Sequence, residues 1–189
     1  MSSQTIAHIQ TQLIGYFYEK GRTAFKLAED SYDDWALLLC EQGSFDYRID
    51  EDSGTVKVGE FVLCPPGYTL SRKINKRLTF HFANFKLEAL NKDGEKVFYP
   101  YFGKLSCRNS MRLMYTMEQM RQSKNTISIH YTEHLLNDIL YQILDEHLLL
   151  RQKQNPVDQD ILEAIRYLNE YAFSGISLTE AAEHVGLSP

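Results

Sequence analysis

Residues Gly59 to Gly67 read Gly-Glu-Phe-Val-Leu-Cys-Pro-Pro-Gly, a short apolar run between a glycine and a Pro-Pro-Gly turn. Proline fixes its own φ and glycine accepts a positive φ, so this ending favours a sharp reversal of the chain. A run of four apolar residues bounded by such signals is typical of a buried β-strand. The stretch therefore predicts a strand over 61–64 that ends in a tight turn.

Similar runs lie on both sides of this strand. They are separated by further turn signals, among them Gly43 and the Glu-Asp-Ser-Gly sequence at 51–54. Many short strands at spacings of about ten residues are typical of a β-barrel or a β-sandwich. We therefore expect the first hundred residues to be all-β. The other expected strands are 11–18, 35–40, 45–49, 55–58 and 78–85.

After Pro100 the apolar residues recur every three or four positions, which is the period of a helix. The first helical face carries four methionines and a tyrosine; core packing is the main interpretation and an adaptable binding face is the alternative. A second helix is expected over 128–151, and its wide apolar stripe must bury against the barrel, the neighbouring helix or a second subunit. The first face consists of Met111, Met114, Tyr115, Met117 and Met120.

The C-terminal segment follows a polar linker at 151–156 and a third expected helix that starts near 158. It reads Ile-Ser-Leu-Thr-Glu-Ala-Ala-Glu-His-Val-Gly-Leu-Ser-Pro over 176–189. Ser177 fits a helix cap, Ala182 is small enough for a second helix to cross over it, Gly186 suits a positive-φ turn and Ser188 caps the next helix. The pattern predicts the first half of a helix-turn-helix, with a generic helical hairpin as the alternative.

Charge is unevenly distributed along the chain. Residues 1–155 carry 19 basic and 19 acidic side chains, whereas residues 156–189 carry one basic and six acidic ones and so hold the whole net charge of −5. A surface that binds DNA is normally basic. We therefore expect the C-terminal segment to bind DNA poorly by itself, and we expect the base-reading helix to lie beyond Pro189.

The chain has neither the apolar length of a membrane span nor the basic and apolar start of a signal peptide. Its three cysteines are widely spaced and form no Cys-x-x-Cys pair, which favours reduced, buried thiols in a cytoplasmic protein.

These features together resemble two known families. Residues 59–67 are similar to the Gly-x5-Pro-x-Gly element of cupin barrels, and the barrel, helices, linker and C-terminal segment together resemble an AraC/XylS-type transcription regulator. The resemblance implies an α+β chain: a cupin-like, double-stranded β-helix barrel over 1–104, a helical dimerisation region over 105–152, and a linker with a truncated helix-turn-helix over 153–189. It also implies a homodimer that senses a small-molecule effector without being an enzyme, and DNA binding only by the full-length protein.

The effector would contact side chains that point into the barrel. Because side chains alternate along a strand, Phe80 and Phe82 are expected to point inward with Asn84 following, and His81 outward. The resemblance adds three positions to the candidate ligand-binding set, Cys40, Leu70 and Arg72. A ring-bearing or anionic effector suits this set better than a polyol. The basic stretch at 72–77 is interpreted as a solvated loop, with a place at the barrel mouth as the alternative.

No metal or other cofactor is expected. Cupins that bind metal have a histidine where this chain has Leu70, and residues 43–59 contain no histidine. The His-x-x-Glu-His sequence at 130–134 has the spacing of a zinc-protease motif, but a catalytic zinc needs a third protein ligand and no suitable one follows. Two other functions remain open: a metal-independent cupin enzyme, such as an isomerase or epimerase, and a small-molecule-binding protein with no role at DNA.

Overall fold

The computed structural model describes residues 6–123 and 129–152, together with residues 164, 167, 179, 180, 184 and 186. The strands are β1 (His8–Arg22), β2 (Glu29–Ser31), β3 (Trp35–Ile49), β4 (Asp52–Lys57), β5 (Glu60–Cys64), β6 (Thr69–Leu90), β7 (Lys96–Val97) and β8 (Gly103–Ser106). The helices are α1 (Ser110–Ser123) and α2 (Ile129–Gln152).

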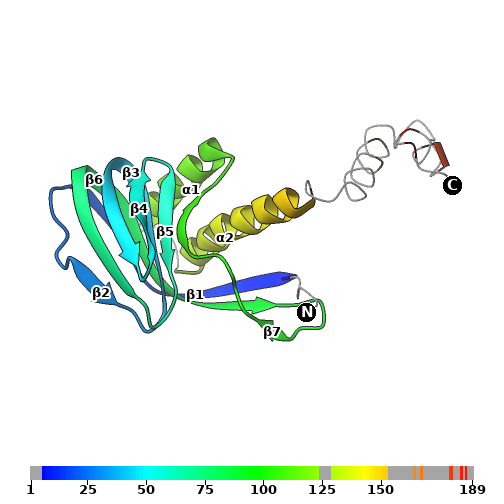
Figure 1. Ribbon diagram of the computed structural model, residues 1–189, viewed down its shortest axis with the longest axis horizontal. Coiled ribbons are helices and arrows are strands. Elements are labelled where there is room, and N and C mark those ends of the chain that lie inside the picture. Colours follow the sequence, from blue (N-terminus) through cyan, green and yellow to red (C-terminus); the bar gives the residue numbers. More distant parts are fainter. Residues whose placement is uncertain are drawn as a thin grey trace. The chain divides into compact units, whose positions relative to one another are not determined.

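All eight strands belong to one antiparallel sheet (Figure 1). Its order is β1-β6-β3-β5-β8; β2 and β7 pair with β6, and β4 pairs with β3. The long strand β6 therefore lies between β1 and β3. The structure confirms a β-rich region followed by two helices.

The turn after β5 has the geometry that its sequence predicts. The Tyr68 N–H donates a hydrogen bond to the Pro65 carbonyl at 3.4 Å, and Gly67 between them has a φ of 80°. Proline at the second position and a positive-φ glycine at the third are the requirements of a type II turn. The turn directs the chain into β6.

Two expectations about the strands were wrong. Residues 35–40 and 45–49 form a single strand, β3, which passes through an irregular stretch around Gly43 instead of ending there. The basic stretch at 72–77 is not a loop but part of β6, where Lys73 lies opposite Asp46 and Arg72 opposite Tyr47 on β3. Its charged side chains gave the stretch the composition of a loop, whereas backbone pairing with β3 makes it a strand.

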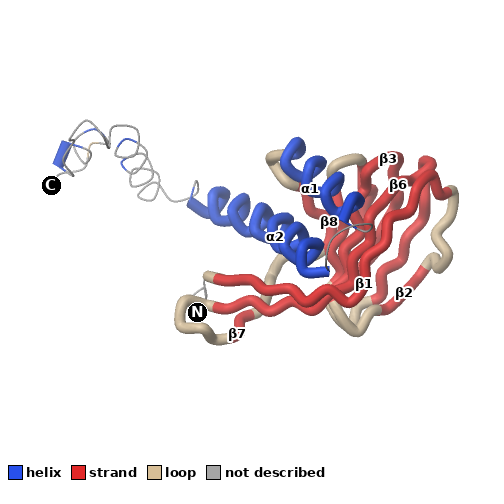
Figure 2. Tube along the Cα trace, turned by 180° about the vertical axis from the view of Figure 1, so that it is seen from behind, coloured by secondary structure: helices blue, strands red, loops and turns tan. Residues whose placement is uncertain are grey.

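The core of the barrel lies on one face of this sheet. Leu38, Cys40 and their inward neighbours form one buried cluster with residues of β4, β5 and β6. Helix α1 lies on one side of the sheet (Figure 2). Leu37 and Leu39, of opposite parity to Leu38 and Cys40, are also fully buried. Each such side chain contributes roughly 1.5–3 kcal/mol of burial free energy. Burial on both faces explains why alternation alone does not orient β3.

Helix α1 does not bury its methionines as one face. Met117 and Met120 are at most 1% exposed, whereas Met111 is 83% and Tyr115 is 67% exposed. Core packing is therefore the wrong interpretation for Met111 and Tyr115. The face that packs is centred on Leu113, Met117 and Met120, because these positions follow the 3.6-residue period more closely.

Residues 1–143 and 144–189 form two compact units. In the second unit, Gly186 has a φ of 75° and lies in a turn, and the centroids of the Tyr167 and His184 rings are 4.0 Å apart. The other helix-turn-helix positions, Ser177, Ala182 and Ser188, lie outside the described residues. Among the described helices, none combines the length and the apolar character that crossing a bilayer requires.

Candidate ligand pocket

A pocket of about 330 Å³ opens beside the barrel core, between β1, β6 and the segment that joins β1 to β3. We call this segment, residues 23–34, the strap. The pocket combines four phenylalanine rings with three cationic side chains. Its lining residues are Phe17, Glu19, Arg22, Ala24, Phe25, Lys26, Arg72, Phe80 and Phe82.

The phenylalanine rings form a continuous apolar wall. Phe17 and Phe82 are directly opposite each other on β1 and β6, and their rings stack with centroids 4.7 Å apart. Phe25 of the strap contacts Phe80 at 5.5 Å and meets the core residue Phe45 edge-on at 5.7 Å. Such a wall offers π-faces and ring edges to a planar apolar group.

Arg72 fastens the strap to β6. Its Nε donates to the Leu27 carbonyl at 3.3 Å, its Nη1 donates to the Tyr32 hydroxyl at 2.7 Å, and its Nη2 lies 3.6 Å from a carboxylate oxygen of Asp30. The guanidinium also lies 5.0 Å from the centroid of the Phe25 ring, and the side chain is only 10% exposed. Burial raises the pKa of Tyr32 to about 12, so its hydroxyl keeps its proton beside Arg72. Arg72 thus has protein partners on three sides.

Lys26 and Arg22 are the cations at the open side of the pocket. Arg22 is 3.9 Å from Glu19, a long contact between two half-exposed side chains that holds neither strongly. Within residues 6–123 and 129–152, no carboxylate lies within ion-pair distance of Lys26. An anionic group placed against the phenylalanine wall would therefore find Lys26 available, and Arg72 already engaged.

The six predicted ligand-binding residues are divided by the structure. Arg72, Phe80 and Phe82 line the pocket together. Cys40 and Leu70 are fully buried in the barrel cluster, with Cys40 opposite Phe80 on the neighbouring strand, so they lie behind the pocket wall. Burial raises the pKa of the Cys40 thiol to about 12 and keeps it protonated.

The sixth residue, Asn84, is not among the lining residues of this pocket. Its side-chain amide donates a hydrogen bond to the Trp35 carbonyl at 3.1 Å.

Sequence reasoning missed the β1 and strap contributions. Phe17 could have been found, because it alternates with Tyr16 and Tyr18 in an expected strand. The strap residues Ala24, Phe25 and Lys26 could not, because residues 23–28 follow no helix or strand period and their position depends on contacts with β6, which is distant in sequence.

The His-x-x-Glu-His sequence lies at the start of α2, beside the edge of β1. One carboxylate oxygen of Glu133 accepts a hydrogen bond from the Leu13 N–H at 2.8 Å, and the other is 2.9 Å from His130 Nδ1. Glu133 therefore covers a backbone donor at the sheet edge. Within the described part of the chain, no three His, Cys, Asp or Glu side chains are placed to hold a metal ion.

A scan against protein-family models found no match, and a search of the curated proteins found none either. Partial similarity exists to solved structures. A conserved protein of unknown function from Streptococcus pyogenes is 16% identical, with 42% of this chain and 75% of that chain covered and a TM-score of 0.34.

A cupin superfamily protein from Desulfitobacterium hafniense is 11% identical over 43% of this chain and 80% of its own, with a TM-score of 0.33. A cupin-2 domain containing protein from Shewanella frigidimarina is 13% identical over 44% and 72%, with a TM-score of 0.29. Each of these similarities covers about two fifths of this chain. The function of this chain therefore has to be inferred from its own residues.

Proposed function

We propose that this chain is the effector-sensing and dimerising part of an AraC-type transcription regulator. The observation that carries the proposal is the pocket at the side of the barrel, where a phenylalanine wall meets an uncommitted lysine. Such a site suits reversible binding of a small molecule. Effector binding would shift the population of dimer arrangements, and no covalent bond would be made or broken.

The effector that fits best is a small molecule with a planar ring and an anionic substituent. The ring would lie against Phe17, Phe80 and Phe82, and the anion would approach Lys26. A volume of about 330 Å³ is near the lower end for ligand pockets and suits a single ring with short substituents. A polyol would leave most of its hydroxyl groups without partners on this wall.

Dimerisation is assigned to the outer face of α1. Met111, Met114 and Tyr115 are 83%, 38% and 67% exposed and are spaced so that they share one side of the helix. Exposed apolar stripes of this kind are typical of protein interfaces. A second copy of the chain is the proposed partner.

The regulatory role rests on the helix-turn-helix pattern, with the positive-φ turn at Gly186 in support. It is tested by producing the gene's full-length product and measuring its binding to DNA from its own promoter region, with and without sodium benzoate as a probe. We expect sequence-specific binding whose affinity changes with benzoate, and no DNA binding by residues 1–189 alone. A full-length product that binds benzoate but never DNA would instead support a binding protein or a metal-independent enzyme.

A further inference from the structure

The strands that carry the pocket carry a second, polar group of side chains on their opposite face. On β6, His81 stands between Phe80 and Phe82; on β1, Tyr16 and Tyr18 flank Phe17. Because successive side chains of a strand point to opposite faces, a strand that shifts to admit a ligand moves both groups together. The polar group is therefore mechanically tied to the pocket wall.

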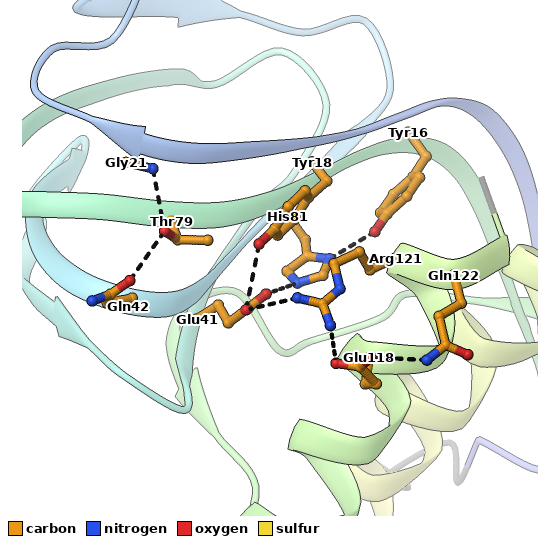
Figure 3. A network of polar contacts seen from close by, with 10 residues as sticks. All are labelled: Tyr16, Tyr18, Gly21, Glu41, Gln42, Thr79, His81, Glu118, Arg121 and Gln122. Carbon is orange, nitrogen blue, oxygen red and sulfur yellow. Dashed lines mark hydrogen bonds and ion pairs between the residues drawn. The ribbon is translucent and has the colours of Figure 1, made fainter. Parts of the chain in front are cut away.

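His81 is the centre of this polar group (Figure 3). Its ring is 1% exposed; Nδ1 is 2.7 Å from the Tyr16 hydroxyl and Nε2 is 2.9 Å from a carboxylate oxygen of Glu41 on β3. Burial lowers the pKa of His81, although Glu41 opposes this effect, and burial raises the pKa of Tyr16. The neutral ring then donates from Nε2 to Glu41 and accepts from Tyr16 at Nδ1, which fixes the direction of both hydrogen bonds.

Glu41 also connects the sheet to helix α1. Its other carboxylate oxygen is 3.5 Å from Nη1 of Arg121, near the C-terminal end of α1, and 3.5 Å from the Tyr18 hydroxyl. The guanidinium of Arg121 lies 5.6 Å from the centroid of the Tyr18 ring. The contact between Glu41 and His81 is short, at 2.9 Å, and the His81 side chain is buried. The contact between Glu41 and Arg121 is longer, at 3.5 Å, and both side chains are partly exposed. The Glu41–Arg121 contact is thus weaker than the Glu41–His81 contact.

Arg121 has a second partner on its own helix, because it also pairs with Glu118. Arg121 can therefore leave Glu41 and still keep a carboxylate partner. Breaking the Glu41–Arg121 contact should for this reason cost little free energy. A shift of Glu41 by a few tenths of an ångström is enough to convert a 3.5 Å contact into a normal hydrogen bond or to lose it.

We propose that the Glu41–Arg121 contact is a switchable joint through which the state of the pocket sets the position of helix α1. The joint would regulate the proposed dimer surface, since Met111, Met114 and Tyr115 lie on the same helix. This inference rests on the proposed function for its ligand, but the joint itself is a property of residues 16–18, 41, 80–82 and 121.

The test follows amide hydrogen exchange of residues 113–121 by mass spectrometry in four proteins: wild type, Phe17→Ala, Arg121→Gln and the double variant. We expect Phe17→Ala, which alters the pocket wall, to change α1 exchange about fivefold or more in the wild-type background and by less than about 1.5-fold when Arg121 is already Gln. Arg112→Gln is the matched control, because Arg112 lies on the same helix but pairs with Asp138 of α2. Equal effects of Phe17→Ala in the Arg121→Gln and wild-type backgrounds would overturn the joint.

The same exchange measurement with sodium benzoate separates the two proposals. If calorimetry shows that benzoate binds, we expect it to change the hydrogen exchange of α1 in wild type and in Arg112→Gln but not in Arg121→Gln. The affinity of Arg121→Gln for benzoate should stay within about twofold of the wild-type value. A benzoate response that persists in Arg121→Gln would overturn the joint. If benzoate does not bind, the ligand proposal fails, and the Phe17–Arg121 cycle still decides the joint.

Discussion

His81 is the residue at which the electrostatics of the sheet are concentrated. Five ionisable side chains from three elements face it: Tyr16 and Tyr18 from β1, Glu41 from β3, and Glu118 and Arg121 from α1. Burial is the largest influence on its pKa and lowers it below the ordinary value of a histidine. The folded protein therefore holds His81 neutral at a pH where the unfolded chain begins to take up a proton.

Protonation of His81 should destabilise the fold. Since the unfolded state binds the proton more readily, its contribution to the free energy of unfolding is fully present above pH 6.5 and is lost as the pH falls toward the lowered folded-state pKa. Denaturant unfolding at pH 7.5 and 5.5 should show a smaller loss for His81→Gln than for wild type. His130→Gln, which removes a 77% exposed side chain, should change the pH dependence less. An identical pH dependence in His81→Gln and wild type would show that His81 is not buried in its neutral form.

Gly43 is the second position where a single residue determines local structure. Its φ is 90°, and a Cβ there would lie 2.2 Å from the Arg77 carbonyl oxygen of β6. Gly43→Ala should cost about 1–3 kcal/mol in the free energy of unfolding because backbone must move. Gly59 has a similar φ of 79° but open space around it, so Gly59→Ala isolates the backbone strain and should cost less. If denaturant titrations gave equal losses of unfolding free energy for Gly43→Ala and Gly59→Ala, the close approach to Arg77 would have no effect on stability.

At the level of elements, alternation along a strand was the most reliable predictor. It placed Phe80 and Phe82 toward the barrel and His81 on the other face, and the structure confirms this arrangement. It could not show that β6 begins at Thr69, because the exposed charges of residues 72–77 have the composition of a loop. Nor could the spacing of the methionines show which of them pack, since a helical period gives faces without saying what covers them.

The strap is held to β6 by the backbone pairing of β2 and by the side chain of Arg72. Arg72→Met keeps most of the alkyl chain but removes the hydrogen bonds to Leu27 and Tyr32 and the ion pair with Asp30. We expect a loss of about 2 kcal/mol in the free energy of unfolding and faster proteolysis within residues 23–34. Lys73→Met, at the next and exposed position on β6, is the control and should change neither. Unchanged proteolysis of Arg72→Met would mean that the backbone pairing of β2 with β6 holds the strap without Arg72.

Helix α1 should form the dimer interface through its exposed apolar side chains. Met111→Asp and Tyr115→Asp each place a charge in the proposed interface and should weaken self-association tenfold or more, or about 1.4 kcal/mol, in sedimentation equilibrium. Val58→Asp introduces the same charge at a 52% exposed site between β4 and β5 and should leave association unchanged. Unchanged self-association of both α1 variants would show that the dimer interface lies elsewhere.

At the scale of the whole molecule, the proposed joint connects a pocket on one face of the sheet to helix α1 on the other. The sequence patterns were sufficient for the β-rich region and the two helices, and three of the six residues that they indicated as ligand-binding, Arg72, Phe80 and Phe82, line one pocket. They were insufficient for the strap, since its place is set by contacts between residues more than forty positions apart, such as Arg72 with Leu27. The polar network could not be predicted for the same reason, because Tyr16, Glu41 and Arg121 become neighbours only in the folded protein.

The central claim, that the pocket senses a small anionic ring compound, is tested most directly by calorimetric titration of residues 1–189 with benzoate and its neutral isostere benzamide. The account predicts one benzoate site, benzamide binding at least about tenfold weaker, and a similar loss of benzoate affinity in Lys26→Ala. Lys20→Ala, at an exposed position of β1 that does not line the pocket, should bind like wild type. Equal affinity for benzoate and benzamide, or full benzoate affinity in both Lys26→Ala and Phe82→Ala, would contradict it.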